Sequence, residues 1–120
     1  MLRLAALLLI FLPSLALADV RLLMAEQAGC IYCERWDAEI APAYPKTAEG
    51  AAAPLQRYDL RAGPPDGVAL ARRVIFTPTF VLVEDGREVA RMEGYAGDEF
   101  FWFQLRRMLD EAEISLETGG

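Results

Sequence analysis

The stretch "AEQAGCIYCERWDAEI", residues 25–40, contains both cysteines of the chain, Cys30 and Cys33. Trp36 and Ile40 follow Cys33 at a spacing typical of one face of an α-helix. Polar and charged residues occupy most of the positions between them. We therefore expect the cysteine pair on the first turn of a helix, with Cys30 outermost and Cys33 facing the core.

This position suits a redox-active pair. The thiolate is the attacking species, and the free N–H groups and positive dipole end of a helix N-terminus stabilise it. Gly29, directly before the pair, permits the backbone angles of a strand-to-helix corner. The placement predicts a redox-active disulfide with Cys30 as the nucleophile and Cys33 as the resolving cysteine. Ile31 and Tyr32, between the two cysteines, are candidate substrate-binding residues.

Two other uses of the pair fit the chemistry less well. A structural disulfide between cysteines so close in sequence stabilises a fold by roughly 2 kcal/mol, against about 4.7 kcal/mol for a loop of about 100 residues. A closed zinc site needs four nitrogen or sulfur ligands, whereas the chain has 2 cysteines and no histidine. We therefore expect no metal and no bound cofactor.

The balance of charge argues against several classes of partner. The 120 residues include 12 lysines and arginines and 18 aspartates and glutamates, which gives a net charge of −6. An acidic chain without a basic run does not suit binding to nucleic acid or to an anionic lipid surface. No repeat or low-complexity linker divides the sequence. We expect a monomer whose partners are neutral or basic protein surfaces.

Residues 1–18, "MLRLAALLLIFLPSLALA", are typical of a cleaved secretory signal peptide. Arg3 precedes an apolar run that ends in the small-x-small pattern of a cleavage site. The alternative is a retained membrane anchor, but the apolar run has only about 14 residues, whereas a membrane-spanning helix needs roughly 20. We therefore expect an exported, periplasmic protein with a single domain over residues 19–116 and a frayed tail over 117–120.

The remaining elements alternate between strand and helix patterns. A short apolar run before the cysteines predicts a buried strand, and Asp85-Gly86 is a strong hairpin signal. Pro42 either ends or kinks the first helix. The expected strands cover residues 19–25, 55–60, 79–83 and 88–92, and the expected helical segments begin at residue 30 or lie within 45–54, 68–74 and 97–112. This order predicts an α/β fold, a four-stranded mixed sheet flanked by helices on both faces.

A second motif, Thr77-Pro78-Thr79, stands directly before the third expected strand. Proline at the first residue of a strand is common and means little alone. Together with the Cys-x-x-Cys pair on a strand-to-helix corner, in this order of elements, the motif resembles the thioredoxin superfamily. The resemblance implies a minimal thioredoxin fold and thiol–disulfide oxidoreductase activity. It also implies a cis Thr77–Pro78 bond beside the cysteines, with Thr77 and Pro78 binding the substrate peptide.

The chain departs from the cytoplasmic thioredoxins close to the pair. Those proteins have Gly-Pro between the cysteines, where this chain has Ile31 and Tyr32. They also bury an aspartate that assists proton transfer to the second cysteine, at a position that is Met24 here. Glu26 lies nearer and could substitute, although a glutamate at such a place is more often a solvated loop carboxylate. The proton acceptor for Cys33 therefore stays open.

Three longer stretches narrow the resemblance. The segments "EQAGCIYCERWDAEIAPAYPKTAEG" (26–50), "LRAGPPDG" (60–67) and "FTPTFVLVEDGREVARMEGYAGDEFFW" (76–102) are similar to the periplasmic thioredoxins of bacterial Sox sulfur-oxidation systems. This resemblance implies a reductase whose client is an oxidised cysteine of the Sox sulfur-carrier complex. It also implies a membrane electron-transfer protein as the reductant of the pair.

Other functions stay open at this point. A disulfide oxidase or isomerase, or a reductant in cytochrome c maturation, would use the same cysteines at a different redox potential. Strong oxidants owe their potential to a stabilised reduced thiolate. Ile31 and Tyr32 provide no basic side chain for that purpose, which favours a reductase. From another class, the domain could bind a client or a metal in its cleft without turnover.

Overall fold

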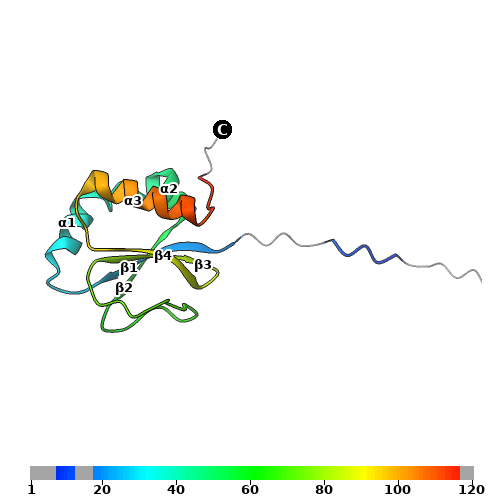
Figure 1. Ribbon diagram of the computed structural model, residues 1–120, viewed down its shortest axis with the longest axis horizontal. Helices are drawn as coiled ribbons and strands as arrows, with labels where there is room; N and C mark the ends of the chain where they lie inside the picture. The colour runs from blue at the N-terminus through cyan, green and yellow to red at the C-terminus, as the bar shows by residue number, and fades with distance from the viewer. Residues whose placement is uncertain (1–7, 13–17, 117–120) are drawn as a thin grey trace, which may run out of the picture.

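The structure is a computed structural model that describes residues 8–12 and 18–116 (Figure 1). Its elements are β1 (Val20–Glu26), α1 (Ile31–Glu39), the 3-10 helix η1 (Tyr44–Lys46), α2 (Ala48–Ala52), β2 (Leu55–Asp59), β3 (Thr79–Glu84), β4 (Arg87–Glu93) and α3 (Asp98–Glu111). The predicted signal peptide lies mostly outside the described residues, and the predicted tail lies entirely outside them. Among the described residues, no helix has the length and apolar character needed to cross a membrane.

The four strands form one mixed sheet, as predicted, in the order β2-β1-β3-β4. β1 and β2 are parallel, and β3 is antiparallel to both β1 and β4. Asp85 and Gly86 form the predicted hairpin turn with φ angles of 51° and 79°. The carboxyl ends of β1 and β2 and the start of β3 therefore lie at the same edge of the sheet, where the loop after β1 meets the segment before β3.

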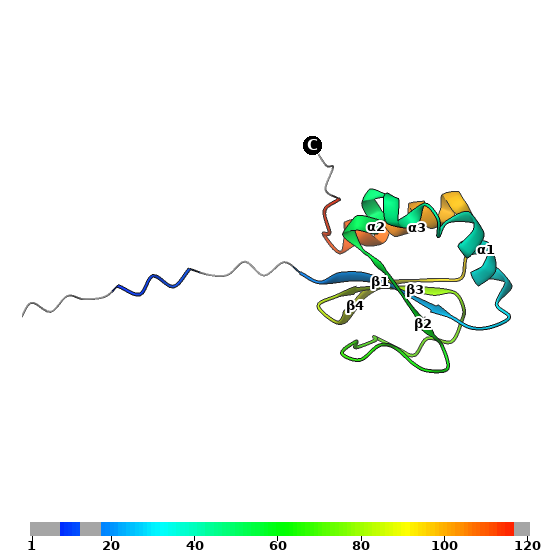
Figure 2. The same ribbon diagram turned by 180° about the vertical axis from the view of Figure 1, so that it is seen from behind.

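Alternate residues of the central strands point to opposite faces of the sheet. On one face, Leu22 and Met24 of β1 pack with Trp36 of α1, Phe80 of β3 and Phe101 of α3. Figures 1 and 2 show α1, α2 and α3 together on this side. We call it the helix face. It holds the larger part of the core, in which the rings of Trp36, Phe80 and Phe101 pack at centroid distances of 5.1–5.7 Å.

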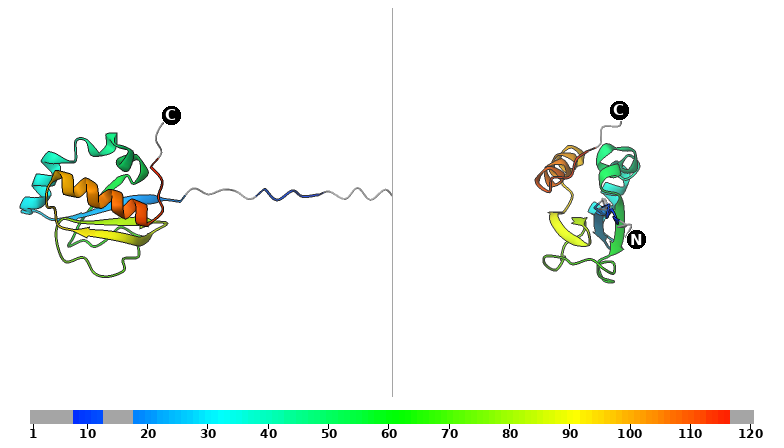
Figure 3. Two further views of the ribbon diagram at one scale, coloured as in Figure 1. Left: turned by 45° about the horizontal axis from the view of Figure 1, so that its top comes forward. Right: turned by 90° about the vertical axis from the view of Figure 1, so that its right-hand side faces the viewer.

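The opposite side of the sheet, which we call the loop face, carries a smaller core. Leu23 and Ala25 of β1 and Val81 and Val83 of β3 point to this side. The long connection from β2 to β3 covers them and runs beneath the sheet in Figure 1 and at the bottom of the right panel of Figure 3. This face is therefore covered by extended chain.

The predicted helix over residues 68–74 was wrong, and with it the expectation of helices on both faces. Val68 and Leu70 both pack on the sheet, while Ala69 between them forms a bridge with Arg87. This spacing of two is that of an extended chain, in which neighbouring residues point to opposite sides. Contact with the edge of β4 overrides the helical pattern that these residues show locally.

The first helix ends where one of the two interpretations of Pro42 placed its end. α1 stops at Glu39, and Ile40 caps it by donating its backbone N–H to the carbonyl of Trp36. A turn then leads into η1 and α2, which confirm the expected helical turn before β2. The helix therefore stops before the proline and does not continue through it with a kink.

Candidate functional site

The cysteine pair lies at the N-terminus of α1. Cys30 is the N-cap residue, and Cys33 lies on the first turn. Gly29 has a φ of +80°, in the left-handed region that glycine adopts without strain. The two cysteines form a disulfide with their Cα atoms 5.2 Å apart, and Sγ of Cys30 accepts a 3.1 Å hydrogen bond from the backbone N–H of Cys33. The expected position of the pair is confirmed.

The residues of this turn differ in exposure. Cys33 is 4% exposed and belongs to the core of the helix face, whereas Cys30 is only partly buried at its margin. Between them, Ile31 is 64% exposed and Tyr32 is 51% exposed. Cys30 is thus the more accessible cysteine, and two large apolar side chains that the core does not use stand next to it.

The fold brings the second predicted motif to this corner. The Thr77–Pro78 peptide bond is cis, as the resemblance implied. Pairing of β1 with β3 places Thr79 opposite Ala25, close to the end of β1. Nε2 of Gln27 donates a 3.0 Å hydrogen bond to Oγ1 of Thr77, which joins the loop before the cysteines to the motif. The two motifs are far apart in sequence and adjacent in space.

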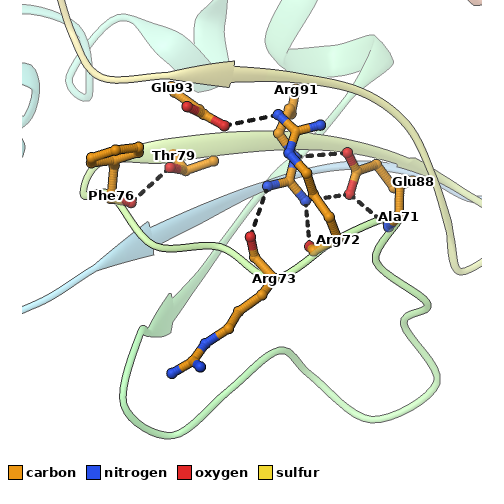
Figure 4. Close-up of polar contacts among 8 residues, drawn as sticks. All are labelled: Ala71, Arg72, Arg73, Phe76, Thr79, Glu88, Arg91 and Glu93. Carbon is orange, nitrogen blue, oxygen red and sulfur yellow. Dashed lines mark hydrogen bonds and ion pairs between the residues drawn. The ribbon is translucent and has the colours of Figure 1, made fainter.

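Hydrogen bonds hold the motif from both sides. The buried Pro78 accepts a 2.7 Å hydrogen bond at its carbonyl from the backbone N–H of Gly94. Oγ1 of Thr79 donates a 2.6 Å bond to the carbonyl of Phe76, as Figure 4 shows. Directly before the motif, Ile75 is 63% exposed and Phe76 is 55% exposed. The segment before Pro78 thus presents apolar side chains to solvent on a fixed backbone.

Three residues of this site were not expected from the sequence. No local pattern could identify Gln27, because its role depends on a contact with Thr77, which is distant in sequence. The sequence did contain a signal for Ile75 and Phe76. They are two large apolar residues directly before the Thr77–Pro78 bond, and proline disfavours a helical conformation at the residue that precedes it.

A groove opens beside Tyr32. It has a volume of about 440 Å³ and is lined by Tyr32, Arg35, Glu93, Gly94, Tyr95 and Ala96. The hydroxyl of Tyr95 donates a hydrogen bond to the carboxylate of Glu39 in α1. Burial and this hydrogen bond raise the pKa of Tyr95. The groove gives an extended segment room beside the cysteine corner.

Glu26, the carboxylate considered as a proton acceptor for Cys33, is engaged in an ion pair. Met24 is fully buried in the core, while Glu26 is the last residue of β1. Arg57 of β2 lies 2.8 Å from the carboxylate of Glu26 and 2.7 Å from that of Asp37 in α1. Burial lowers the pKa of Arg57, but the hydrogen bonds with Asp37 and Glu26 outweigh it, so the net shift is upward. Glu26 thus ends a strand and is ion-paired instead of lying in a loop, while its side chain remains 31% exposed to solvent, in line with the expected solvation.

The described residues offer little to a metal ion. In residues 8–12 and 18–116, no three histidine, cysteine, aspartate or glutamate side chains are grouped as metal ligands would be. Both sulfurs are bonded to each other. What this site can do chemically is exchange a disulfide for two thiols.

Comparison with known proteins identifies a similar solved structure. No protein-family model matches the chain, and no curated protein does. Among solved structures, the chain is similar to the crystal structure of the periplasmic thioredoxin SoxS from Paracoccus pantotrophus in its reduced form. The two are 57% identical in sequence, the match covers 78% of this chain and 99% of that chain, and the TM-score is 0.77.

Proposed function

We propose that this chain, which belongs to the thioredoxin family and is a thiol–disulfide oxidoreductase, works as a reductase of disulfides in a protein client. In this proposal Cys30 is the nucleophile and Cys33 is the resolving cysteine. The observation that carries this proposal is the difference in accessibility and position between the two cysteines. Cys30 is the more accessible and caps α1, with a helix N–H directed at its sulfur, whereas Cys33 is 4% exposed.

The reaction balances as two successive exchanges. The Cys30 thiolate attacks one sulfur of the client disulfide, and the other client sulfur leaves as a thiolate and takes up a proton. The Cys33 thiolate then attacks Sγ of Cys30 and releases the second client thiolate. The client gains two electrons, and the protein loses two as its own disulfide forms. An external donor must return two electrons and two protons before the next turnover.

The surface around the pair supports a protein as the client. Four large apolar side chains near the two motifs are each more than half exposed: Ile31 and Tyr32 lie between the cysteines, and Ile75 and Phe76 stand directly before Thr77. We call these four residues the docking surface. A small thiol compound does not need so much apolar area. Within the described residues, no backbone hydrogen bond involves Thr77. Its amide and carbonyl are free to pair with an extended client segment, as in strand addition to a sheet edge.

The similar structure supports a place and a partner for this reaction. That protein is a periplasmic thioredoxin named SoxS. We propose the periplasm as the location of this chain, with residues 1–18 removed on export. We further propose that the client is an oxidised cysteine of the Sox sulfur-carrier complex and that a membrane electron-transfer protein restores the reduced pair.

Trapping of the client tests the roles of the two cysteines. Cys33→Ser removes the resolving thiol, so the mixed disulfide on Cys30 should accumulate and be recovered from the periplasm as a covalent complex. Cys30→Ser removes the nucleophile and should recover none. Recovery by Cys30→Ser and not by Cys33→Ser would reverse the assignment. The identity of the captured protein tests the proposed Sox client directly.

Equilibration with glutathione tests the direction of electron flow. A reductase should have a reduction potential well below that of the strong periplasmic oxidants, which lies at roughly −120 mV. A value at or above roughly −130 mV would mean that the pair transfers disulfides into clients, as an oxidase does. Disulfide-reductase activity that is lost when Cys30 is replaced would exclude a module that only binds clients.

A further inference from the structure

The segment that carries Ile75 and Phe76 has no regular secondary structure of its own, and two side chains of β4 hold it. Glu88 accepts a 3.0 Å hydrogen bond from the backbone N–H of Ala71. Arg91 donates hydrogen bonds of 2.7 Å to the carbonyl of Arg72 and 3.4 Å to that of Arg73. Figure 4 shows the two side chains reaching across to this stretch of backbone, while the Arg73 side chain points away from them.

Glu88 and Arg91 also bind each other. Nε and a terminal nitrogen of Arg91 lie 2.8 and 2.6 Å from the two carboxylate oxygens of Glu88. The side chains are only 6% and 5% exposed, for Arg91 and Glu88 respectively. Burial alone would raise the pKa of Glu88, but the hydrogen bonds from Arg91 and Ala71 bring it below its usual value. The pair is therefore ionised and sheltered from water.

A β-bulge makes this pair possible. Residues three apart on a regular strand point to opposite faces of the sheet. In β4, however, Ala90 is opposite Leu82 and Glu88 is opposite Val83, so Val89 is an extra residue. The extra residue shifts the alternation by one position. As a result Glu88 and Arg91 both point to the loop face.

The backbone groups that the pair binds, at residues 71–73, lie close in sequence to Ile75 and Phe76. Val74, the residue after Arg73, is buried in the core of the loop face. The exposed Ile75 and Phe76 follow, and the carbonyl of Phe76 is bound by Thr79. We call residues 71–76 the docking segment. Its backbone is held at one end by Arg91 and Glu88 and at the other by Thr79.

We propose that Arg91 and Glu88 are positioning residues for client binding, which hold Ile75 and Phe76 where a protein segment bound at the cysteine pair would contact them. This inference rests on the proposed function, because it names part of the surface that receives the client. Neither residue takes part in the thiol exchange. Loss of the pair should weaken binding of a protein disulfide and leave the chemistry of the cysteines unchanged.

Arg91→Lys is the first variant for the test. The lysine retains the positive charge beside Glu88, so the carboxylate is not left buried and unpaired. A lysine ammonium cannot reproduce the planar fork that reaches the carboxylate and two carbonyls together. The double variant Glu88→Gln/Arg91→Gln removes both charges and provides a second route should the lysine destabilise the fold.

A matched control comes from the helix face. Arg106 of α3 binds Glu49 at 3.0 Å; the Glu49 side chain is 11% exposed and that of Arg106 is 63% exposed. This ion pair also joins two segments distant in sequence, but it does not touch the connection from β2 to β3. Arg106→Lys therefore makes the same chemical change to an ion pair away from the docking surface.

The assay compares a protein disulfide with a small one. Insulin is the protein substrate and oxidised glutathione is the small one, with dithiothreitol as the electron source. In Arg91→Lys and in the double variant, the KM for insulin should rise about five-fold or more, with kcat within about two-fold of the wild type. The rate with oxidised glutathione and the equilibrium constant with glutathione should stay within about two-fold. Arg106→Lys should change neither KM nor kcat.

Other results would contradict either the positioning role of Arg91 and Glu88 or the proposed function. An unchanged KM for insulin in both folded Arg91 variants would overturn the positioning role, as would an equal loss of activity with insulin and with oxidised glutathione. A KM that rises as much in Arg106→Lys would show a general effect of ion-pair loss and would also overturn it. Failure of the wild type to reduce insulin at all would instead refute the proposed function.

Discussion

The two faces of the sheet are held by different interactions. On the helix face, Trp36, Phe80 and Phe101 form a cluster of aromatic rings that closes an apolar core. On the loop face the core is smaller, and a buried ion pair between Arg91 and Glu88 fastens the covering chain through its backbone. Apolar packing therefore stabilises the helix face, whereas directional hydrogen bonds hold much of the covering chain on the loop face.

The difference fits the tasks of the two faces. Cys33 belongs to the helix-face core, so the apolar cluster supports the helix that presents the cysteines. Ile75 and Phe76 belong to the connection on the loop face and remain exposed. Hydrogen bonds of defined geometry can fix a backbone whose side chains stay exposed, which apolar burial of those side chains could not do. Four experiments test this difference between the two faces.

Truncation in the aromatic cluster should have the largest effect on stability. Phe101 is 1% exposed, so Phe101→Ala removes a ring from the centre of the helix-face core and should lower the free energy of unfolding by about 3–5 kcal/mol. Phe103, two residues along α3, is 61% exposed, and Phe103→Ala should change it by no more than about 0.5 kcal/mol. Urea unfolding measures both. Equal losses would contradict the picture of a single apolar cluster.

Removal of one partner of the loop-face pair should come next. Arg91→Met leaves Glu88 buried without a counter-charge and should cost about 3 kcal/mol. The double variant Glu88→Leu/Arg91→Met removes the unpaired charge and should recover part of this loss. Recovery stays incomplete because the carbonyls of Arg72 and Arg73 still lack their donor. A cost below about 0.5 kcal/mol for Arg91→Met would mean that the pair behaves like an exposed one.

Acid should weaken the loop face selectively. The pKa of Glu88 in the folded protein is lower than the ordinary value of 4.5. Its contribution to stability is therefore complete above pH 4.5 and is lost as the pH falls through the lowered value. Unfolding curves between neutral pH and pH about 2 should show a shallower decline in Glu88→Gln than in the wild type. Parallel curves would refute a contribution from the ionised carboxylate.

The smallest effect concerns two tyrosine hydroxyls, one on each face. Tyr58 of the loop face has a buried hydroxyl without a hydrogen-bond partner among the described residues, so Tyr58→Phe should leave stability unchanged or raise it by up to about 1 kcal/mol. On the helix face, the hydroxyl of Tyr44 donates a 2.6 Å bond to the carbonyl of Ala53. Tyr44→Phe leaves that buried carbonyl unpaired and should cost about 1–2 kcal/mol. Thermal unfolding of the two variants compares the faces directly. A loss of stability in Tyr58→Phe would contradict the absence of a hydrogen-bond partner for the Tyr58 hydroxyl.

Local patterns predicted the parts of the molecule whose causes are local. The helical spacing after Cys33, the glycine at position 29 and the Asp85-Gly86 turn each depend on neighbouring residues, and each lies where it was expected. The helix expected over residues 68–74 failed for the complementary reason. Its backbone pairs with Arg87 of β4, a contact that no window within the segment contains.

Residue spacing and backbone preferences act over a few residues, and they sufficed to predict the redox pair, its place at a helix N-terminus and the order of strands and helices. Tertiary structure set how the second motif meets the pair, through Gln27 and Thr77. It also decided which side chains hold the docking segment. Regular alternation along β4 separates Glu88 from Arg91, and the bulge at Val89 that unites them is a property of its pairing with β3.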